Sequence, residues 1–341
     1  MKSIRSRQVT LKSRPETVPN ESNFELVTVE LGPPKPGQIL IRNHLLSVDP
    51  TTRSQFRAGS IMTDNFKVIQ LGQPIWGMGV GQVEESQHPY FSAGDFVYGP
   101  IGWREYALEG GEGFLKVDTT IAPASYYLGV LGGSGFSAYI GLYWAGELKP
   151  GESVFVSAAA GSTGAIACQL AKADGCYVVG SAGSDEKCDW LRKVAKVDHA
   201  INYKTCGSLS QKLGEVFPKG IDVNFENVGA DHLIAAIENM AHLGRIAFCG
   251  QISQYNLKDG DISPLKIPLT RIIAKSIRIQ GFVVTEHTAE YFKFLAHMVP
   301  LLKSGKIAVA ETFEEGLENA PKAFFKLFSG ENLGKMIVKI N

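Results

Sequence analysis

A short glycine-rich turn constrains this chain more than any other feature. The apolar run SVFVSA leads into 158–164 (AAAGSTG), and the run 165–172 that follows has helical spacing. Strand, turn and helix in this order open a dinucleotide-binding α/β unit, with Ala159 at the first glycine position. Gly161 would let a pyrophosphate approach the backbone, Gly164 would let helix and strand pack closely, and the helix N-terminus favours an anion. An ordinary tight turn is the alternative, which the flanking strand and helix disfavour.

The same rhythm of strand, turn and helix continues beyond this turn. A helix is predicted over 232–242, where Gly244 would stop it. Further short apolar runs predict strands at 176–180, 199–203, 222–225, 245–249 and 276–284. Strands that alternate with helices indicate a parallel sheet covered by helices on both faces.

The first 130 residues have a different character, with short β-like runs separated by Gly and Pro. These runs lie at 37–48, 72–84, 94–99 and 113–117. Closely spaced strands of this kind are typical of a compact, mostly antiparallel β body. The C-terminal tail returns to that style, with helical spacing at 318–330 and a final strand at 335–340.

The expected fold class is therefore α/β, with a doubly wound parallel Rossmann sheet inserted into a mostly antiparallel β domain. The tail is expected to pack back on the N-terminal body, which makes that domain discontinuous. The predicted domains are 1–130 with 308–341, and 131–307.

Composition excludes several classes of function. Lys plus Arg equals Asp plus Glu at 34 each, so the 341-residue chain lacks the basic excess of a nucleic-acid-binding protein. No apolar run reaches the roughly 18 residues of a membrane span, and no apolar segment follows the basic N-terminus as in a secretory signal. An odd count of five cysteines predicts reduced thiols. A cytoplasmic enzyme that binds neither nucleic acid nor membrane is expected.

The end of the second predicted strand indicates which dinucleotide is bound. NAD enzymes usually place Asp or Glu there for the ribose 2′-hydroxyl. This chain has small residues at 180–184 (GSAGS), and its first carboxylate is Asp185. Small residues leave room for a 2′-phosphate, and Lys187 follows as a cation, although a solvated surface lysine is its commoner role. NADPH is therefore favoured over NADH.

A catalytic zinc site is improbable. Residues 1–167 contain no cysteine and only two histidines, His44 and His88, and no Cys-x2-Cys pair occurs anywhere. Zinc needs several Cys, His or carboxylate ligands converging on one cleft. No metal is expected.

Several longer motifs resemble one known family. They are 158–172 (AAAGSTGAIACQLAK), 183–187 (GSDEK), 202–204 (NYK), 226–229 (ENVG), 249–256 (CGQISQYN), 280–284 (QGFVV), 332–335 (NLGK), and Val48-Asp49-Pro50 with Arg53. Together they resemble the zinc-free medium-chain dehydrogenases/reductases, in particular the group of prostaglandin reductase (leukotriene B4 12-hydroxydehydrogenase), curcumin reductase and alkenal double-bond reductase. The resemblance covers nearly the whole chain.

The resemblance implies NADPH-dependent reduction of a carbon–carbon double bond conjugated to a carbonyl, in a homodimer with a GroES-like catalytic β domain. It assigns cofactor contacts along the pyrophosphate, the 2′-phosphate, the ribose and the nicotinamide. The implied cofactor-binding residues are Gly161, Ser162, Thr163, Gly164, Lys187, Tyr203, Asn227, Cys249, Gly250, Ile252, Ser253, Tyr255, Phe282, Val283, Val284 and Asn332.

Tyr255 is the predicted catalytic residue. Hydride attack on the β-carbon of an enal or enone builds negative charge on the carbonyl oxygen, and a donor placed there stabilises the enolate. A phenol with a pKa near 10 is protonated at pH 7 and can donate. A structural lid is the alternative role for Tyr255. Delivery of the α-carbon proton by this phenol or by water stays open.

Two departures from the family pattern concern the pocket. Thr51-Thr52 stands where many relatives carry Tyr-Met, and Gly133-Ser134 stands where they carry Met-Pro. Both changes shorten the side chains and add polarity, so a prostanoid preference is not carried over. A zinc-free quinone reductase and a catalytically idle NADPH-binding sensor or structural protein are the alternative functions.

Overall fold

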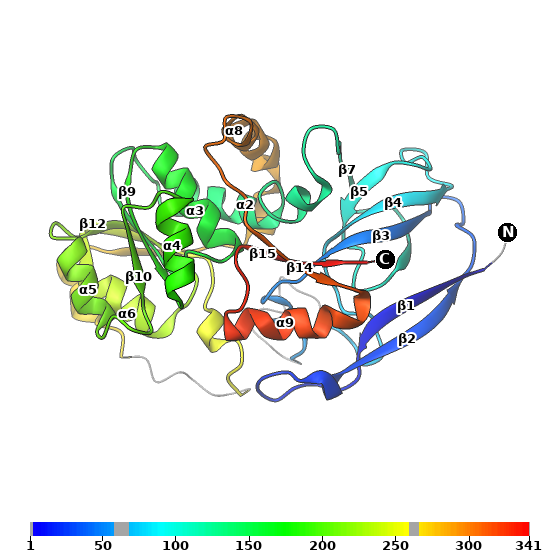
Figure 1. The fold of residues 1–341 in the computed structure, drawn as a ribbon, viewed down its shortest axis with the longest axis horizontal. Coiled ribbons are helices and arrows are strands. Elements are labelled where there is room, and N and C mark those ends of the chain that lie inside the picture. Colours follow the sequence, from blue (N-terminus) through cyan, green and yellow to red (C-terminus); the bar gives the residue numbers. More distant parts are fainter. Residues whose placement is uncertain (1–2, 58–67, 259–265, 341) are drawn as a thin grey trace. The chain divides into compact units, whose positions relative to one another are not determined.

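The chain is seen here as a computed structural model that describes residues 3–57, 68–258 and 266–340 (Figure 1). It divides into two compact units. Unit 1 comprises Met1–Leu128, Tyr255–Asp261 and Glu311–Asn341, and unit 2 comprises Gly129–Gln254 and Ile262–Ala310. Unit 1 combines segments from both ends of the chain with a short internal segment, and that internal segment interrupts unit 2.

Unit 2 is built on a parallel sheet. Among the described residues its strands follow the order β10-β9-β8-β11-β12-β13, with every neighbouring pair parallel. The first strand in sequence lies inside the sheet and later strands extend it on both sides, which confirms the predicted doubly wound arrangement. The strands are β8 (Ser153–Val156), β9 (Tyr177–Ala182), β10 (His199–Asn202), β11 (Ile221–Glu226), β12 (Met240–Phe248) and β13 (Arg278–Gly281).

Helices cover this sheet on both faces (Figure 1). They are α2 (Gly133–Tyr139), α3 (Ser162–Ala173), α4 (Asp185–Lys193), α5 (Leu209–Val216), α6 (Ala230–Asn239), α7 (Leu269–Lys275) and α8 (Tyr291–Lys303), the π-helix η4 (Ile140–Ala145), and the 3-10 helices η5 (Ile252–Gln254) and η6 (Val284–Glu290). On one face a buried cluster joins Leu213 of α5 and Ile237 of α6 to Phe155 of β8. On the other, Gly180 of β9 lies so near the α3 thiol of Cys168 that an added Cβ would be 3.7 Å away.

The helix predicted over 232–242 is shorter than expected. It ends at Asn239, and Met240 already has the extended backbone of β12. Ile221 pairs with Met240 but Val223 pairs with Arg245, so β12 carries a bulge of extra residues in this stretch. The apolar spacing of this stretch therefore serves a strand at its end, which helical periodicity alone does not reveal.

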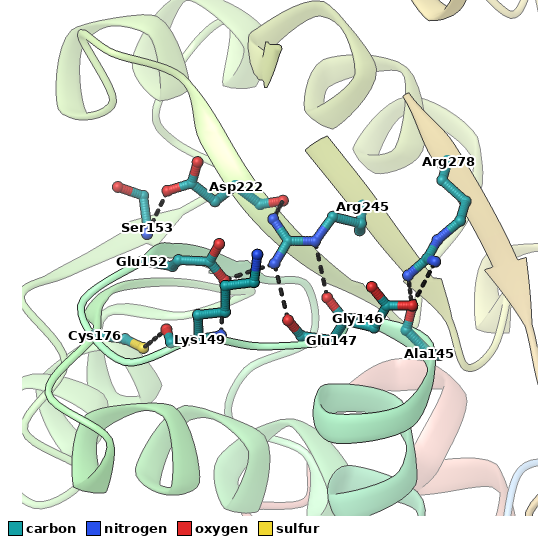
Figure 2. A network of polar contacts seen from close by, with 10 residues as sticks. All are labelled: Ala145, Gly146, Glu147, Lys149, Glu152, Ser153, Cys176, Asp222, Arg245 and Arg278. Atoms are coloured by element: carbon teal, nitrogen blue, oxygen red, sulfur yellow. Dashed lines mark hydrogen bonds and ion pairs between the residues drawn. The ribbon is translucent and has the colours of Figure 1, made fainter. Parts of the chain in front are cut away.

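The amino ends of the unit 2 strands are joined by one arginine (Figure 2). The Arg245 guanidinium, on β12, donates to the carbonyl oxygens of Gly146 (3.0 Å), Glu147 (3.1 Å) and Asp222 (3.3 Å). It also forms a 2.6 Å ion pair with Glu152 just before β8. These contacts connect three strand starts on the edge of the sheet opposite the glycine-rich turn.

Unit 1 contains a second sheet with the order β14-β15-β3-β4-β5-β7 among the described residues, and β6 also pairs with β3. The β14–β15 pair is parallel and the other pairs are antiparallel, as predicted for the β domain. The strands are β3 (Ile39–Ser47), β4 (Gly79–Ser86), β5 (Phe96–Gly99), β6 (Tyr106–Glu109), β7 (Leu115–Lys116), β14 (Glu311–Glu315) and β15 (Lys335–Lys339).

An antiparallel ribbon of β1 (Ile4–Leu11) and β2 (Phe24–Leu31) completes unit 1 and was not predicted. Its buried residues pack with Trp103, Phe56 and Phe324 in one apolar cluster, all three of them fully buried. The helices of unit 1 are α1 (Thr52–Gln55), α9 (Ala320–Ser329), η1 (Glu21–Asn23), η3 (Ala124–Leu128) and η7 (Leu317–Asn319). Within the described residues, no helix is long and apolar enough to cross a membrane.

Candidate active site

The turn after β8 is closed so tightly that its last position accepts only glycine. A Cβ on Gly164 would lie 2.4 Å from the carbonyl oxygen of Ala158, and a Cβ on Gly161 would lie 3.2 Å from the same oxygen. Gly161 caps α3 without a side-chain bond, and Ser162 and Thr163 form the first turn. In the part of the chain described, the Ser162 hydroxyl is shielded from solvent and has no hydrogen-bond partner. Helix N–H groups beside such a hydroxyl suit a phosphate.

Two lysines and a tyrosine meet at the end of β9. A Cβ on Gly183 would lie 3.0 Å from the Tyr203 hydroxyl and 3.2 Å from Cε of Lys204. Lys187 lies in the first turn of α4, where its backbone N–H donates to the N-cap Ser184 at 3.3 Å. Burial, and then the charge of Lys204, lower the pKa of the Lys187 ammonium. An anion bound between the two ammonium groups would relieve their repulsion.

The nearest carboxylate in sequence is engaged elsewhere. Oδ1 of Asp185 accepts a 2.8 Å hydrogen bond from the Asn202 side chain at the end of β10. The site thus offers cations at the position where an NAD enzyme offers a carboxylate. Sequence reasoning missed Lys204, although the motif 202–204 contains it, because only the fold brings the end of β10 beside the end of β9.

The loop after β11 is bonded to the end of β8. The backbone N–H of Asn227 donates to Ser157 Oγ at 2.7 Å, and the Asn227 side-chain amide donates to the Ser157 carbonyl at 2.7 Å. The Asn227 carbonyl in turn accepts from the N–H of Ile252 at 3.0 Å. Asn227 therefore lies next to the strand that leads into the glycine-rich turn, with its side chain held in one orientation.

A buried glutamate organises this loop. Oε1 of Glu226 accepts hydrogen bonds from the Ser157 hydroxyl and from the N–H groups of Val228 and Gly229, at 2.7 to 2.8 Å. Oε2 accepts from Asn224 at 3.1 Å. Burial raises the pKa of the Glu226 carboxyl, and these four donors oppose the rise. Sequence reasoning assigned Glu226 no role; an acid directly after an apolar strand is the signal that could have identified it.

The segment after β12 rests on the same loop. Backbone N–H groups of Cys249 and Gly250 donate to the Glu226 carbonyl at 2.9 and 3.1 Å, and the Ser253 hydroxyl donates to the Val228 carbonyl at 2.5 Å. Burial, with a smaller contribution from Glu226, raises the pKa of the Cys249 thiol to about 12. Cys249 is therefore a neutral thiol at physiological pH and contributes shape and not nucleophilicity.

The remaining predicted residues of unit 2 follow β13. Phe282 and Val283 connect β13 to η6, which begins at Val284. A Cβ on Gly141 of η4 would lie 2.9 Å from Cζ of Phe282, so this ring packs closely on the π-helix. All the unit 2 residues predicted to bind a cofactor thus follow the carboxyl ends of strands β8 to β13, the edge where doubly wound sheets bind ligands.

The two other predicted residues belong to unit 1. Tyr255 lies in a turn directly after η5 and is half-buried. Asn332 lies between α9 and β15, is buried, and donates from its side chain to the Gly334 carbonyl at 2.9 Å.

Comparisons with known proteins agree with this architecture. Two family models match, "N-terminal domain of oxidoreductase" over residues 7–117 and "Zinc-binding dehydrogenase" over residues 162–299. A 2-alkenal reductase (NADP(+)-dependent) of Nicotiana tabacum is 42% identical over 99% of this chain and 98% of its own length. Prostaglandin reductase 1 of Bos taurus is 43% identical over 98% of this chain and 99% of its own length.

The chain belongs to the zinc-free medium-chain dehydrogenase/reductase family. The crystal structure of CurA from Vibrio vulnificus in complex with NADPH matches this family member with a TM-score of 0.92. That structure is 35% identical, and the match covers 98% of this chain and 99% of CurA.

One of the matching family descriptions mentions zinc. Among the described residues of this medium-chain reductase, no group of three or more His, Cys, Asp or Glu side chains is arranged to hold a metal ion.

Proposed function

We propose that this chain is an NADPH-dependent reductase of the carbon–carbon double bond in α,β-unsaturated aldehydes and ketones. The observation that carries the proposal is that Lys204 lies beside Gly183 and its charge acts on Lys187, at a place where a carboxylate would favour NAD. Relatives named as an NADP(+)-dependent 2-alkenal reductase and an NADPH-dependent curcumin reductase support the same reaction and cofactor.

Different groups of residues in unit 2 would hold different parts of this cofactor. The first turn of α3 and the unpartnered Ser162 hydroxyl would hold the pyrophosphate. Lys187, Tyr203 and Lys204 would hold the 2′-phosphate through charge-assisted hydrogen bonds. The nicotinamide side would be lined by residues predicted after β12 and β13, namely Cys249, Gly250, Ile252, Ser253, Phe282, Val283 and Val284. Asn227 would contact the bridging phosphates and ribose, and Asn332 would reach the cofactor from unit 1.

The residues of the chain then act on the substrate. When bound, the reduced nicotinamide supplies a hydride to the β-carbon of the conjugated system. Tyr255 donates a hydrogen bond to the carbonyl oxygen, where negative charge grows as the enolate forms. A phenol carries an O–H donor suited to this role. The α-carbon then takes a proton from this phenol or from water.

Replacement of Tyr255 by Phe tests this role. Loss of one donor to a developing oxyanion costs about a hundredfold to a thousandfold in kcat. We expect Tyr255→Phe to lower kcat for an enone by that order and to leave the dissociation constant for NADPH, measured by cofactor fluorescence, close to wild type. A variant that binds NADPH and reduces enones at the wild-type rate would refute the assignment.

The reaction itself is tested by following NADPH oxidation at 340 nm with a panel of enals, enones and quinones, with NADH run in parallel. We expect turnover of enals and enones with NADPH preferred, and the saturated carbonyl compound as product. Turnover of quinones alone would contradict the proposal and favour a quinone reductase. NADPH binding without turnover of any member would favour a non-catalytic binding protein.

We also propose that unit 2 is the NADPH-binding domain and unit 1 the catalytic domain, and that the protein works in the cytoplasm. All five cysteines are free thiols, which suits a reducing compartment. Fractionation of the source cells, with the protein followed by antibody, tests the location.

A homodimer is the assembly we propose. Among the described residues, strand β13 ends its sheet, and its Ile279 is 41% exposed. Leu269 and Ile273 of helix α7, which precedes β13 in the chain, are 64% and 80% exposed. An open strand edge beside exposed apolar side chains is suited to pairing with a second copy of the same edge.

A further inference from the structure

Two motif residues without an assigned role, Arg53 and Asn256, meet inside unit 1. Arg53 ends the motif that begins at Val48, and Asn256 ends the motif that contains Tyr255. The Arg53 side chain is completely buried, and its Nε donates to Oδ1 of Asn256 at 3.1 Å. The two residues are 203 positions apart, so this bond joins the segment that carries Tyr255 to helix α1.

The Arg53 guanidinium is itself held from a third direction. Its Nη2 donates to the carbonyl oxygens of Thr17 at 2.7 Å and Pro15 at 3.2 Å. A guanidinium is planar and its donors diverge in fixed directions, so several acceptors at once fix its orientation. A buried charge needs such acceptors to offset its loss of hydration. Asn256 therefore binds to a group that has little freedom to move.

The helix that carries Arg53 is anchored as well. Lys335 Nζ, almost fully buried, donates to the Val48 carbonyl at 3.0 Å and to Oδ1 of Asp49 at 2.8 Å. The Asp49 carbonyl accepts the N–H of Thr52 at 3.1 Å, at the start of α1. Strand β15, the segment before α1, and Arg53 thus form one continuous polar framework in unit 1.

Tyr255 lies outside the regular helices and strands. It and Asn256 lie in a turn after η5, and both are half-buried. The side chain next to Tyr255 is bonded to the framework, and fixing one residue of a turn restricts the backbone of its neighbour. We propose that Arg53, through its hydrogen bond to Asn256, is a positioning residue that holds Tyr255 at the carbonyl oxygen of the substrate. This inference rests on the proposed function of Tyr255 as the hydrogen-bond donor.

The test compares two substitutions of Asn256 in the full-length protein. Asn256→Ala removes the acceptor of the Arg53 bond, and Asn256→Asp keeps an acceptor oxygen. A misplacement of about 1 Å costs up to about a hundredfold in rate. We expect Asn256→Ala to lower kcat for an enone at least about tenfold, with little change in the dissociation constant for NADPH, and Asn256→Asp to retain kcat within about threefold.

Asn319→Ala is the matched control. It removes an asparagine hydrogen bond of the same kind in the same unit, 2.7 Å from Nδ2 to the Glu315 carbonyl, at an exposed site. Its kcat should equal that of the wild type. The thermal unfolding midpoint of each variant shows whether it is folded. Because Asn256 is only half-buried, we expect its variants to fold.

A double-mutant cycle separates positioning from general support. If Asn256 acts through Tyr255, the fall in kcat caused by Asn256→Ala disappears when Tyr255 is already Phe. A fall of equal size in both backgrounds overturns the inference, as does a folded Asn256→Ala protein with wild-type kcat. If Tyr255→Phe alone is as fast as the wild type, the donor role fails first and the positioning role fails with it. A slow Tyr255→Phe beside a normal Asn256→Ala leaves the proposed function standing and refutes only the positioning role.

Discussion

Lys204 illustrates how single side chains set the cofactor preference. Its Cε lies 3.2 Å from the position that a Cβ on Gly183 would take, and its charge acts on Lys187. A hydrogen bond to a charged group contributes about 1.5–3 kcal/mol, a factor of roughly ten to a hundred in binding. We expect Lys204→Ala to raise KM for NADPH by that factor while KM for NADH stays unchanged.

Lys193→Ala controls for the loss of one positive charge on the same unit. Lys193 lies at the end of α4, is 73% exposed and pairs with Asp189 at 2.8 Å. Its removal should leave both KM values close to wild type. Equal increases in KM for NADPH in the two variants would point to the overall charge of the surface and exclude a specific 2′-phosphate contact.

His232 makes the stability of unit 2 sensitive to acid. Burial lowers the pKa of its ring from 6.5 to about 4, and its Nε2 has no hydrogen-bond partner among the described residues. Between these values the unfolded chain binds a proton that the folded chain does not, so stability falls as pH falls through 6.5 towards 4. From pH 7 to pH 5 this contribution amounts to about 2 kcal/mol.

A His232→Gln variant should therefore lose about 2 kcal/mol less free energy of unfolding than the wild type between pH 7 and pH 5. Urea denaturation at the two pH values measures the difference. Identical losses in both proteins would show that His232 is not the group responsible. Because the ring of His232 packs edge-on against Tyr203 at 4.8 Å, the same acidification is expected to disturb the 2′-phosphate region.

Only part of the site could be predicted from single residues. Gly161 and Gly164 follow from a local pattern, and the 2.4 Å approach of the Ala158 carbonyl oxygen to an added Cβ shows why glycine is needed at 164. Glu226 and Lys204 act through neighbours from other strands, and no local pattern specifies such neighbours. Asn256 belongs to a specific motif, but its partner Arg53 lies 203 positions away in the sequence. Their hydrogen bond could therefore be found only from the tertiary fold.

At the scale of elements, Arg245 joins the amino ends of β8, β11 and β12 in the parallel sheet (Figure 2). The side chain of Arg245 is only 14% exposed, and that of its ion-pair partner Glu152 is only 17% exposed. Removal of one partner from a buried ion pair costs about 3–5 kcal/mol. We expect Arg245→Met to lower the free energy of unfolding of unit 2 by about 3 kcal/mol, measured by hydrogen exchange of its strand amides.

Arg278→Met is the matched control in the same network. Arg278 pairs with Glu147 at 2.6 Å, but the two side chains are 43% and 59% exposed. Exposed ion pairs contribute less than about 1 kcal/mol. A loss as large as that of Arg245→Met would contradict the view that burial makes the difference.

The strand–helix alternation of unit 2 was predictable because each strand there is a short apolar run between turn residues. Strands β1 and β2 were not predicted because charged residues interrupt their apolar residues, as in the β1 sequence IRSRQVTL. The 232–242 helix was overextended for a different reason, since Met240 and Ala241 of β12 continue the helical spacing of the apolar residues in α6. Local patterns thus identified the elements but not their limits.

At the scale of the whole molecule, unit 1 combines segments from both ends of the chain with the short segment Tyr255–Asp261. The sequence predicts a discontinuous domain because the C-terminal strand resembles the N-terminal β runs. It does not predict the return of the short segment at Tyr255, since nothing in the composition of that segment distinguishes it from the loops of unit 2.

The last prediction concerns the proposed dimer. Leu269 and Ile273 lie one helical turn apart on α7, the helix that precedes β13, and their exposure costs free energy unless a partner covers them. Light scattering should give twice the chain mass of 37.0 kDa for the wild type. Ile273→Glu places a charge in this surface and should yield the monomer mass. Leu71→Glu, at a 54% exposed site of unit 1, should remain dimeric. A dimer in the Ile273→Glu protein would show that copies associate through another surface.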